Sequence, residues 1–170
     1  MQNTDTSRDI VAIAHNLRST YNVGALLRTA DAFDLSTVYC TGYTPYPEQD
    51  RDTRSPDLIS RLSNKIDKSA RGARELVRCV YHPGIPALLS ELRADGFIIA
   101  GLEVDDRAVD LADYDPPDKV AVLLGEESGG IPAKLLTSCD VVLRIPQFGA
   151  KHSLNVAVAA GISLYSLRCS

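Results

Sequence analysis

Short apolar runs alternate along the chain with stretches in which apolar residues recur at helical spacing. The apolar runs predict strands at residues 10–14, 37–41, 76–81, 97–102, 120–124 and 141–145. The helical spacing predicts helices at residues 20–33, 57–74, 86–94, 132–138 and 153–167. The polar stretches 42–56 and 105–117 are expected to be loops. Strands that alternate with helices in this way predict an α/β domain with a mostly parallel sheet and helices on both faces.

Length and composition fit one ordinary globular domain that covers residues 1–170. The chain is 45% hydrophobic and 24% charged, and it has no internal repeat or linker. No apolar run approaches the roughly 20 residues that cross a bilayer, so no membrane contact is expected. Residues 1–9 lack the basic, apolar and small-residue pattern of a secretory signal, which favours a cytoplasmic location.

The four cysteines do not form a metal-binding pattern. None lies in a CxxC pair, and none has a histidine at the spacing of a zinc site. Cys40 and Cys79 fall within apolar runs, where a buried and unreactive thiol is expected. The sequence therefore predicts no metal.

Charge is distributed unevenly along a chain whose formal net charge is −4. Residues 61–78 contain six basic and two acidic residues, whereas residues 103–118 contain seven acidic residues and only Arg107 as a base. A basic stripe on an acidic protein can be the footprint of a nucleic acid. Charge alone favours the simpler interpretation of a solvated helical face, so both remain open at this point.

Two predicted strands are followed by segments that are suited to hold a ligand. The strand at 120–124 leads into a glycine-rich turn at 125–130, and the strand at 141–145 leads into a loop before the last helix. The turn lacks the Lys and Ser or Thr of a phosphate-binding loop, and no GxGxxG follows the first strand. These absences argue against an NTPase and a dinucleotide-binding domain. The glycines are consistent with a tight turn as well as with a close approach of ligand to backbone.

The last helix and the first helix each carry polar residues with two interpretations. Ser153 is expected to be the N-cap of the helix at 153–167 and Asn155 a first-turn polar residue, yet either is placed to meet a ligand at the helix start. Asn22 and Arg28 lie six residues apart, about 120° from facing the same way on a helix. Arg28 lies among apolar residues and needs a partner, which a ligand, Asp31 or a C-terminal acid can provide.

Taken together, three segments resemble the motifs of the SpoU (TrmH-type) RNA 2′-O-ribose methyltransferases of the SPOUT class. The first motif, NxGAxxRTAxAF, matches residues 22–33. The second, GxExxG followed by a hydrophobic residue, matches Gly125, Glu127 and Gly130 with Ile131. The third, an Ile-Pro turn followed by Ser-Leu-Asn, matches residues 145–146 and 153–155. The stretch 68–73 also resembles the KTAxGA sequence of that family, so the resemblance covers nearly the whole chain.

The resemblance implies a fold and an activity that patterning alone does not reveal. In this family the C-terminal strands and helix form a deep trefoil knot, an exception to the rule against knotted chains. S-adenosylmethionine binds within the knotted loops, and the enzymes are homodimers whose active site uses both subunits. The implied substrate is structured RNA, either tRNA or rRNA. Many members carry an additional N-terminal RNA-binding domain, which is not expected in this chain.

The resemblance also assigns roles to individual residues. The motif residues implied in catalysis are Asn22, Arg28, Glu127, Ser153 and Asn155. The cofactor is expected to contact Leu102, Gly125, Ile145, Ser153 and Leu154. An arginine is normally too basic to release its proton, so Arg28 is better suited to orient the ribose 2′-OH and its phosphate than to act as a base. RNA contacts are expected at Arg18, Arg61, Lys65, Lys68 and Arg71.

Two other functions are compatible with parts of this pattern. One is a non-catalytic RNA-binding or ribosome-associated module on the same fold. The other is a small-molecule methyltransferase or a nucleotide-binding α/β protein, which the basic stretch and the failed phosphate motifs disfavour. Intact Asn22, Arg28, Glu127 and Asn155 favour the enzyme over both.

Overall fold

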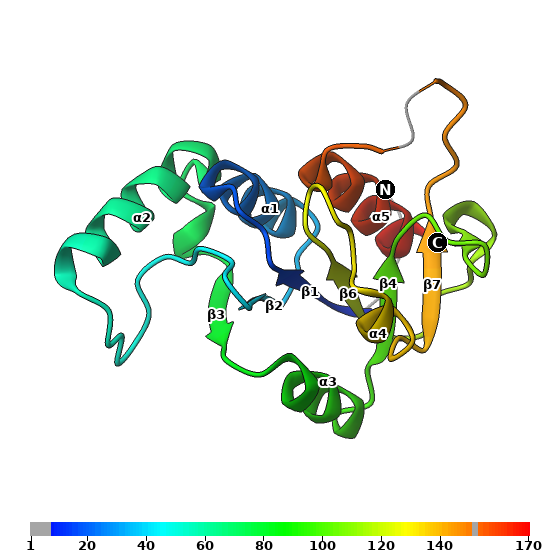
Figure 1. The fold of residues 1–170 in the computed structure, drawn as a ribbon, viewed down its shortest axis with the longest axis horizontal. Helices are drawn as coiled ribbons and strands as arrows, with labels where there is room; N and C mark the ends of the chain where they lie inside the picture. The colour runs from blue at the N-terminus through cyan, green and yellow to red at the C-terminus, as the bar shows by residue number, and fades with distance from the viewer. Residues whose placement is uncertain (1–7, 151–152) are drawn as a thin grey trace, which may run out of the picture.

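A seven-stranded sheet forms the centre of the molecule in the computed structural model, which describes residues 8–150 and 153–170 (Figure 1). The strand order is β3-β2-β1-β6-β4-β7-β5, and the strand pairings in the described part of the chain are all parallel. The strands are β1 (Asp9–His15), β2 (Thr37–Thr41), β3 (Arg78–His82), β4 (Ile98–Leu102), β5 (Val109–Asp110), β6 (Lys119–Leu124) and β7 (Val141–Arg144). The predicted α/β class and parallel sheet are confirmed.

Helices cover both faces of the sheet, as the sequence predicts. Figure 1 shows α1, α2 and α5 on one side and α3 and α4 on the other. Their bounds are α1 (Thr20–Ala32), α2 (Pro56–Ala70), α3 (Ile85–Ala94), α4 (Ala133–Leu136) and α5 (Val156–Cys169). Two 3₁₀ turns, η1 (Ala73–Glu75) and η2 (Leu111–Asp113), complete the elements. No helix among the described residues is both long enough and apolar enough to span a membrane.

The alternation of side chains along the strands produces two separate cores. In β1, Ile10 and Ala12 pack into the core beneath α1 and α5, whereas Val11 and Ile13 pack into the core above α3. Successive side chains of a strand point to opposite faces, so a strand that is apolar throughout must be covered twice. β1 and β6 are thus packed on both faces at the centre of the sheet.

A close crossing of α1 and α2 depends on a glycine of the first motif. A Cβ atom added at Gly24 would overlap Ser69 Oγ and the Ile66 carbonyl oxygen. Ser69 Oγ donates a hydrogen bond across this contact to the Tyr21 carbonyl oxygen, at 3.0 Å. Gly24 therefore lets the two helix backbones approach, which places the basic surface of α2 beside the start of α1.

The element boundaries differ from prediction in several places. The stretch 105–117, expected to be a loop, contains β5 and η2, because a two-residue edge strand is too short to show any periodicity. The helix predicted at 57–74 ends at Ala70, where Arg71 adopts a left-handed conformation as its C-cap. The strand predicted from residue 76 begins at Arg78. The start of α5 also differs, and that difference bears on the site.

Candidate active site

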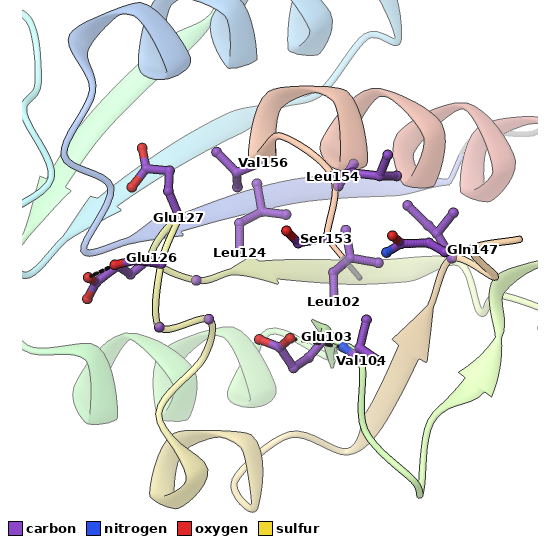
Figure 2. A pocket seen from close by; sticks show the side chains of 16 residues that line it. Leu102, Glu103, Val104, Leu124, Glu126, Glu127, Gln147, Ser153, Leu154 and Val156 are labelled. Atoms are coloured by element: carbon purple, nitrogen blue, oxygen red, sulfur yellow. Dashed lines mark hydrogen bonds between the residues drawn. The ribbon is translucent and has the colours of Figure 1, made fainter. Parts of the chain in front are cut away.

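A pocket of about 320 Å³ lies at the carboxyl ends of β4, β6 and β7. Its walls come from three chain segments, which follow β4, follow β6, and join β7 to α5. Ligands bind at this end of open parallel sheets, and the volume falls within the range of about 300–1,000 Å³ that is usual for small-molecule sites. Figure 2 shows Leu102, Leu124 and Ser153 together at the centre of the pocket. The residues predicted to contact a cofactor all line it: Leu102, Gly125, Ile145, Ser153 and Leu154.

A tight turn after β6 forms one wall of this pocket. The Glu126 N–H donates to the Gly130 carbonyl oxygen at 3.1 Å, and the Gly130 N–H donates back to Glu126 at 2.9 Å. A Cβ atom at Gly125 would overlap the backbone of Gly130 and Ile131, and Gly130 has a φ of +63°. The glycines are therefore required by the turn itself. They also leave backbone groups bare along the pocket, which is compatible with the close approach of a ligand.

Glu103 fastens the turn to the end of β4. Its carboxylate accepts hydrogen bonds from the Ile131 N–H at 2.8 Å and from the Val104 N–H at 2.9 Å. The same side chain lines the pocket (Figure 2). The sequence analysis did not identify Glu103. Its position directly after a strand, at the edge where ligands bind, is the one signal that points to it.

Asn22, Glu127 and Asn155 come together from three distant parts of the chain. The Asn22 amide donates to Glu127 Oε1 at 2.8 Å, and the Asn155 amide donates to Asn22 Oδ1 at 3.3 Å. The Arg18 N–H donates to Glu127 Oε2 at 3.2 Å. Only 5% of the surface of Asn22 is exposed. Three of the residues predicted to be catalytic thus form one chain of hydrogen bonds, which reaches the pocket at Glu127.

This network favours the ionised form of Glu127. Partial burial opposes ionisation, but hydrogen bonds from the Asn22 amide and from backbone N–H groups outweigh it, so the pKa of Glu127 lies below its ordinary value. Hydrogen bonds from Ser128 and Tyr43 likewise hold the pKa of the neighbouring Glu126 below its ordinary value. The turn therefore presents two adjacent negative charges.

The start of α5 corrects one sequence prediction. Ser153 is not the N-cap, because the helix begins at Val156 and Asn155 caps it. Asn155 Oδ1 accepts hydrogen bonds from the Ala157 N–H at 2.9 Å and from the Val158 N–H at 3.4 Å. Serine and asparagine are both good N-caps, so residue type alone cannot choose between positions 153 and 155. The shorter helix leaves Ser153 and Leu154 in the segment before α5, where they line the pocket.

The family is decided by a sequence profile that spans nearly the whole chain. The profile described as the SpoU rRNA Methylase family matches residues 9–165, which include the strands of the sheet and the three motif segments. The chain belongs to the SpoU family. The resemblance drawn from the motifs is therefore confirmed.

Relatives of this SpoU protein include two enzymes named 23S rRNA (guanosine-2′-O-)-methyltransferase RlmB. The one from Neisseria meningitidis serogroup B is 30% identical over 159 residues, which are 94% of this chain and 58% of the relative. The one from Acinetobacter baylyi is 28% identical over 166 residues, or 97% of this chain and 60% of the relative. The chain spans somewhat more than half the length of these relatives.

A solved structure has the same fold. An AdoMet-bound rRNA methyltransferase from Sinorhizobium meliloti matches with a TM-score of 0.78 at 25% identity, and the match covers 95% of this chain and 56% of that one. The SpoU methyltransferase AviRb from Streptomyces viridochromogenes, in complex with AdoMet, matches with a TM-score of 0.76 at 24% identity. It covers 96% of this chain and 57% of AviRb. The seven-stranded α/β architecture is thus shared with SpoU structures.

Arg28, like Asn22 and Asn155, is not among the residues that line the pocket. It is exposed on α1 and lines a separate hollow, of about 460 Å³, with Phe33 and with Val158 and Ile162 of α5. Within the described residues its side chain forms no ion pair or hydrogen bond, so of the possible partners neither Asp31 nor a C-terminal acid pairs with it. One SpoU chain alone therefore does not bring Arg28 and Asn22 into one pocket, because the helix turns them to different sides.

The residues predicted to contact RNA divide into two groups. Arg18, Arg61 and Lys65 line a groove of about 700 Å³ beside the loop between β2 and α2. Lys68 and Arg71 are exposed at the end of α2 but do not line that groove. Sequence reasoning missed the tyrosines of the groove, since the pattern of charge carries no signal for them. No cluster of three metal-ligating side chains occurs in residues 8–150 and 153–170.

Proposed function

We propose that this protein transfers a methyl group from S-adenosylmethionine to the ribose 2′-OH of a structured RNA, either tRNA or rRNA. The observation that carries the proposal is the hydrogen-bonded chain Glu127–Asn22–Asn155, which reaches at Glu127 a pocket lined by all five expected cofactor contacts. Membership of the SpoU family and the names of the relatives support the same reaction. Such a substrate implies a cytoplasmic site of action.

The pocket residues fit S-adenosylmethionine. Leu102, Leu124 and Leu154 give apolar walls suited to a purine ring, and the bare backbone of the turn at Gly125 offers polar groups beside them. The ionised Glu127 carboxylate at the rim suits a ligand that carries positive charge. When bound, the sulfonium supplies the methyl group that the reaction transfers. Ser153 and Asn155 would hold the methionine end.

The acceptor side of the reaction needs a group that orients the ribose. Methyl transfer to a hydroxyl is an in-line displacement, which depends strongly on the positions of the reacting atoms. Arg28 suits this role, because a guanidinium binds a phosphate through two hydrogen bonds and so fixes the neighbouring 2′-OH. Asn22 holds Glu127 in place from the other side. Arg28 must therefore reach a pocket other than that of its own chain.

A second copy of the chain would bring Arg28 to the pocket. Val158, Ile162 and Tyr165 of α5 are 52%, 41% and 59% exposed and follow each other at helical spacing. Leu154, 40% exposed, continues this apolar stripe to the mouth of the pocket. Arg28 lies beside the same stripe. A homodimer that buries the stripe would thus bring Arg28 of one subunit beside the pocket of the other.

A trefoil knot at the C-terminal end is part of this proposal. The segment from β7 to α5 and the turn after β6 line one pocket, although β4 lies between β6 and β7 in the sheet. The likeness to SpoU structures supports a chain path in which one of these segments passes through the loop of the other. The organisation of residues 1–170 as a single catalytic domain remains a prediction of the sequence.

The test is methyl incorporation into RNA, followed by mapping of the modified ribose. The purified protein should transfer tritium from methyl-labelled S-adenosylmethionine to total RNA of cells that lack it. Arg28→Ala should lower the rate by about a hundredfold or more, because the acceptor is no longer oriented, while calorimetry finds unchanged cofactor affinity. Full turnover by Arg28→Ala would overturn the role of this residue. RNA binding without methyl transfer under any condition would instead identify a non-catalytic RNA-binding module.

A further inference from the structure

A second concave surface, separate from the cofactor pocket, combines aromatic and basic side chains. This tyrosine groove, of about 700 Å³, lies between the start of α1, the loop after β2 and the outer face of α2. It shares no lining residue with the cofactor pocket. Its aromatic and cationic members are Arg18, Tyr43, Tyr46, Arg61, Lys65 and Tyr81. This inference rests on the proposed function and extends it to the recognition of RNA.

Two of the three tyrosines form the wall of the groove. The rings of Tyr46 and Tyr81 stack with centroids 4.4 Å apart and planes inclined by 17°. The Arg54 guanidinium lies 3.5 Å from the centroid of the Tyr46 ring and also donates to the Tyr46 carbonyl oxygen. These contacts hold the wall rigid, so Tyr46 and Tyr81 are already engaged within the protein.

Tyr43 differs from its two neighbours because its ring is available. It is 52% exposed, and its hydroxyl donates to Glu126 Oε2 at 2.9 Å. The Arg18 guanidinium lies 6.0 Å from the ring centroid and forms an ion pair with Glu126 at 2.7 Å. The Tyr43 ring is thus anchored at its hydroxyl end while much of its surface faces solvent, which suits a platform for stacking.

The groove carries uncompensated positive charge on its other side. Arg61 and Lys65 lie one turn apart on α2 and are exposed. Neither forms an ion pair within the described part of the chain. The Glu126 carboxylate, which accepts a hydrogen bond from Tyr43, forms an ion pair with Arg18. A chain with a net charge of −4 therefore presents a local basic surface beside a free aromatic ring.

We propose that the tyrosine groove binds a single-stranded segment of RNA next to the target nucleotide, with one base stacked on Tyr43 and phosphates on Arg61 and Lys65. Proteins that hold single strands combine a basic groove with aromatic platforms on which bases stack. A duplex cannot use Tyr43, because its bases are already stacked on each other. Glu126 adjoins Glu127 in the turn of the cofactor pocket, so a strand in the groove leads towards the proposed site of methyl transfer.

The test compares two probes by fluorescence anisotropy. One is a labelled oligouridylate of roughly ten nucleotides, and the other is an abasic strand of equal length. The wild-type protein should prefer the oligouridylate by about tenfold, the effect of one stacked base. Tyr43→Leu should lose this preference, whereas Tyr43→Phe, which keeps the ring, should retain it. An undiminished preference in Tyr43→Leu would overturn the proposal.

Charge variants test the phosphate contacts. Arg61→Gln combined with Lys65→Gln should weaken both probes equally and reduce the slope of log affinity against log salt by about 1.4, for two contacts to a single strand. Lys134→Gln, an exposed lysine of α4 on the opposite side of the sheet, is the matched control and should change neither quantity. An equal loss of affinity in Lys134→Gln would also overturn the proposal that the groove binds single-stranded RNA. Tighter binding of a duplex or an acidic peptide than of the oligouridylate would overturn it as well.

The groove and the proposed function can fail separately. Calorimetry of S-adenosylmethionine with Tyr43→Leu should give the wild-type affinity, because Tyr43 does not line the cofactor pocket. Methyl transfer together with equal affinity for the two probes would disprove RNA binding in the groove and support the proposed enzymatic activity. A stacking preference that depends on Tyr43, without methyl transfer to any RNA, would support the groove and reject the enzyme.

Discussion

Asp52 and Arg54 fix the conformation of the loop that carries Tyr46. The Arg54 guanidinium donates to both carboxylate oxygens of Asp52, at 2.9 and 2.5 Å, and to the carbonyl oxygens of Tyr46 and Pro47. The hydrogen bonds from Arg54 lower the pKa of Asp52 to about 2. Side-chain exposure is only 13% for Arg54 and 5% for Asp52, so solvent screens this ion pair weakly.

Asp52→Asn should therefore destabilise the protein in a pH-dependent manner. At pH 7 we expect a loss of about 1.5–3 kcal/mol in the free energy of unfolding, the range for hydrogen bonds to a charged group. The folded-state pKa is lowered, so the stabilisation is present above the ordinary value of 3.8 and disappears as the pH falls towards about 2. Urea unfolding followed by circular dichroism at pH 7 and pH 3 measures the difference.

Asp105→Asn is the matched control for this prediction. Asp105 pairs with Arg107 at the same spacing, and its Oδ1 accepts from Arg107 Nε at 2.9 Å. The side chains of this pair are 24% and 59% exposed, so the change should cost much less. Equal losses in the two variants would contradict the role of burial at Asp52.

At the scale of elements, the close contact of α1 and α2 governs where the basic side chains of α2 lie. Gly24→Ala would force a methyl group against Ser69 Oγ and the Ile66 carbonyl oxygen. Overpacking of this kind costs about 1–3 kcal/mol, which exceeds the gain of about 1 kcal/mol in helix propensity. Gly24→Ala should thus lower the midpoint of thermal unfolding and weaken binding to the oligouridylate probe, because α2 shifts away from α1.

Ala25→Gly, at the next position of α1, measures the contribution of helix propensity to stability. Ala25 is only partly buried, so this change should cost about 1 kcal/mol from helix propensity and leave α2 in place. Oligouridylate affinity should therefore remain near the wild-type value in Ala25→Gly. If Gly24→Ala raised the unfolding midpoint, the close approach of the helices would not constrain this position.

The elements could largely be predicted from the sequence because their apolar runs are long and covered on both faces. The exceptions share a physical cause. β5 has two residues, too few for a period, and it is held on β7 by backbone pairing and by an ion pair between Asp110 and Arg144. The start of α5 depends on which of two good capping residues adopts the cap geometry. Both outcomes are decided by tertiary contacts that a local pattern does not contain.

The residues of the site likewise divide into those that the sequence pattern identifies and those that depend on tertiary contacts. The resemblance to the family motifs singles out Gly125, Glu127 and Leu154, and all three line one pocket in the structure. Glu103 and Tyr43 could not be identified in this way, because each acts through a partner far away in the chain, the Ile131 N–H and the Glu126 carboxylate. Motif order also predicts that Arg28 belongs to the site without revealing that it faces away from the pocket of its own chain.

At the scale of the whole molecule, the position of Arg28 makes subunit exchange a sharp test of the homodimer. Arg28→Ala and Glu127→Gln should each be inactive: the first lacks the group that orients the ribose, and the second puts an amide against the Asn22 donor. In a symmetric dimer whose sites draw on both chains, each mixed pair contains one site with both wild-type groups. Refolding the two variants together should thus restore about a quarter of wild-type methyl transfer, since half the dimers are mixed.

Ile162→Glu distinguishes this account from one in which Arg28 acts within its own chain. The charge would lie on the apolar stripe of α5, so the variant should be monomeric by light scattering and inactive, yet should bind S-adenosylmethionine. Refolded mixtures that contain Ile162→Glu in both chains should show no rescue. If the Arg28→Ala and Glu127→Gln mixture also remained inactive while forming dimers, Arg28 would have to reach the pocket by a movement of α1 within one chain. The crowded Gly24 contact with α2 opposes such a movement, which is why we expect the rescue.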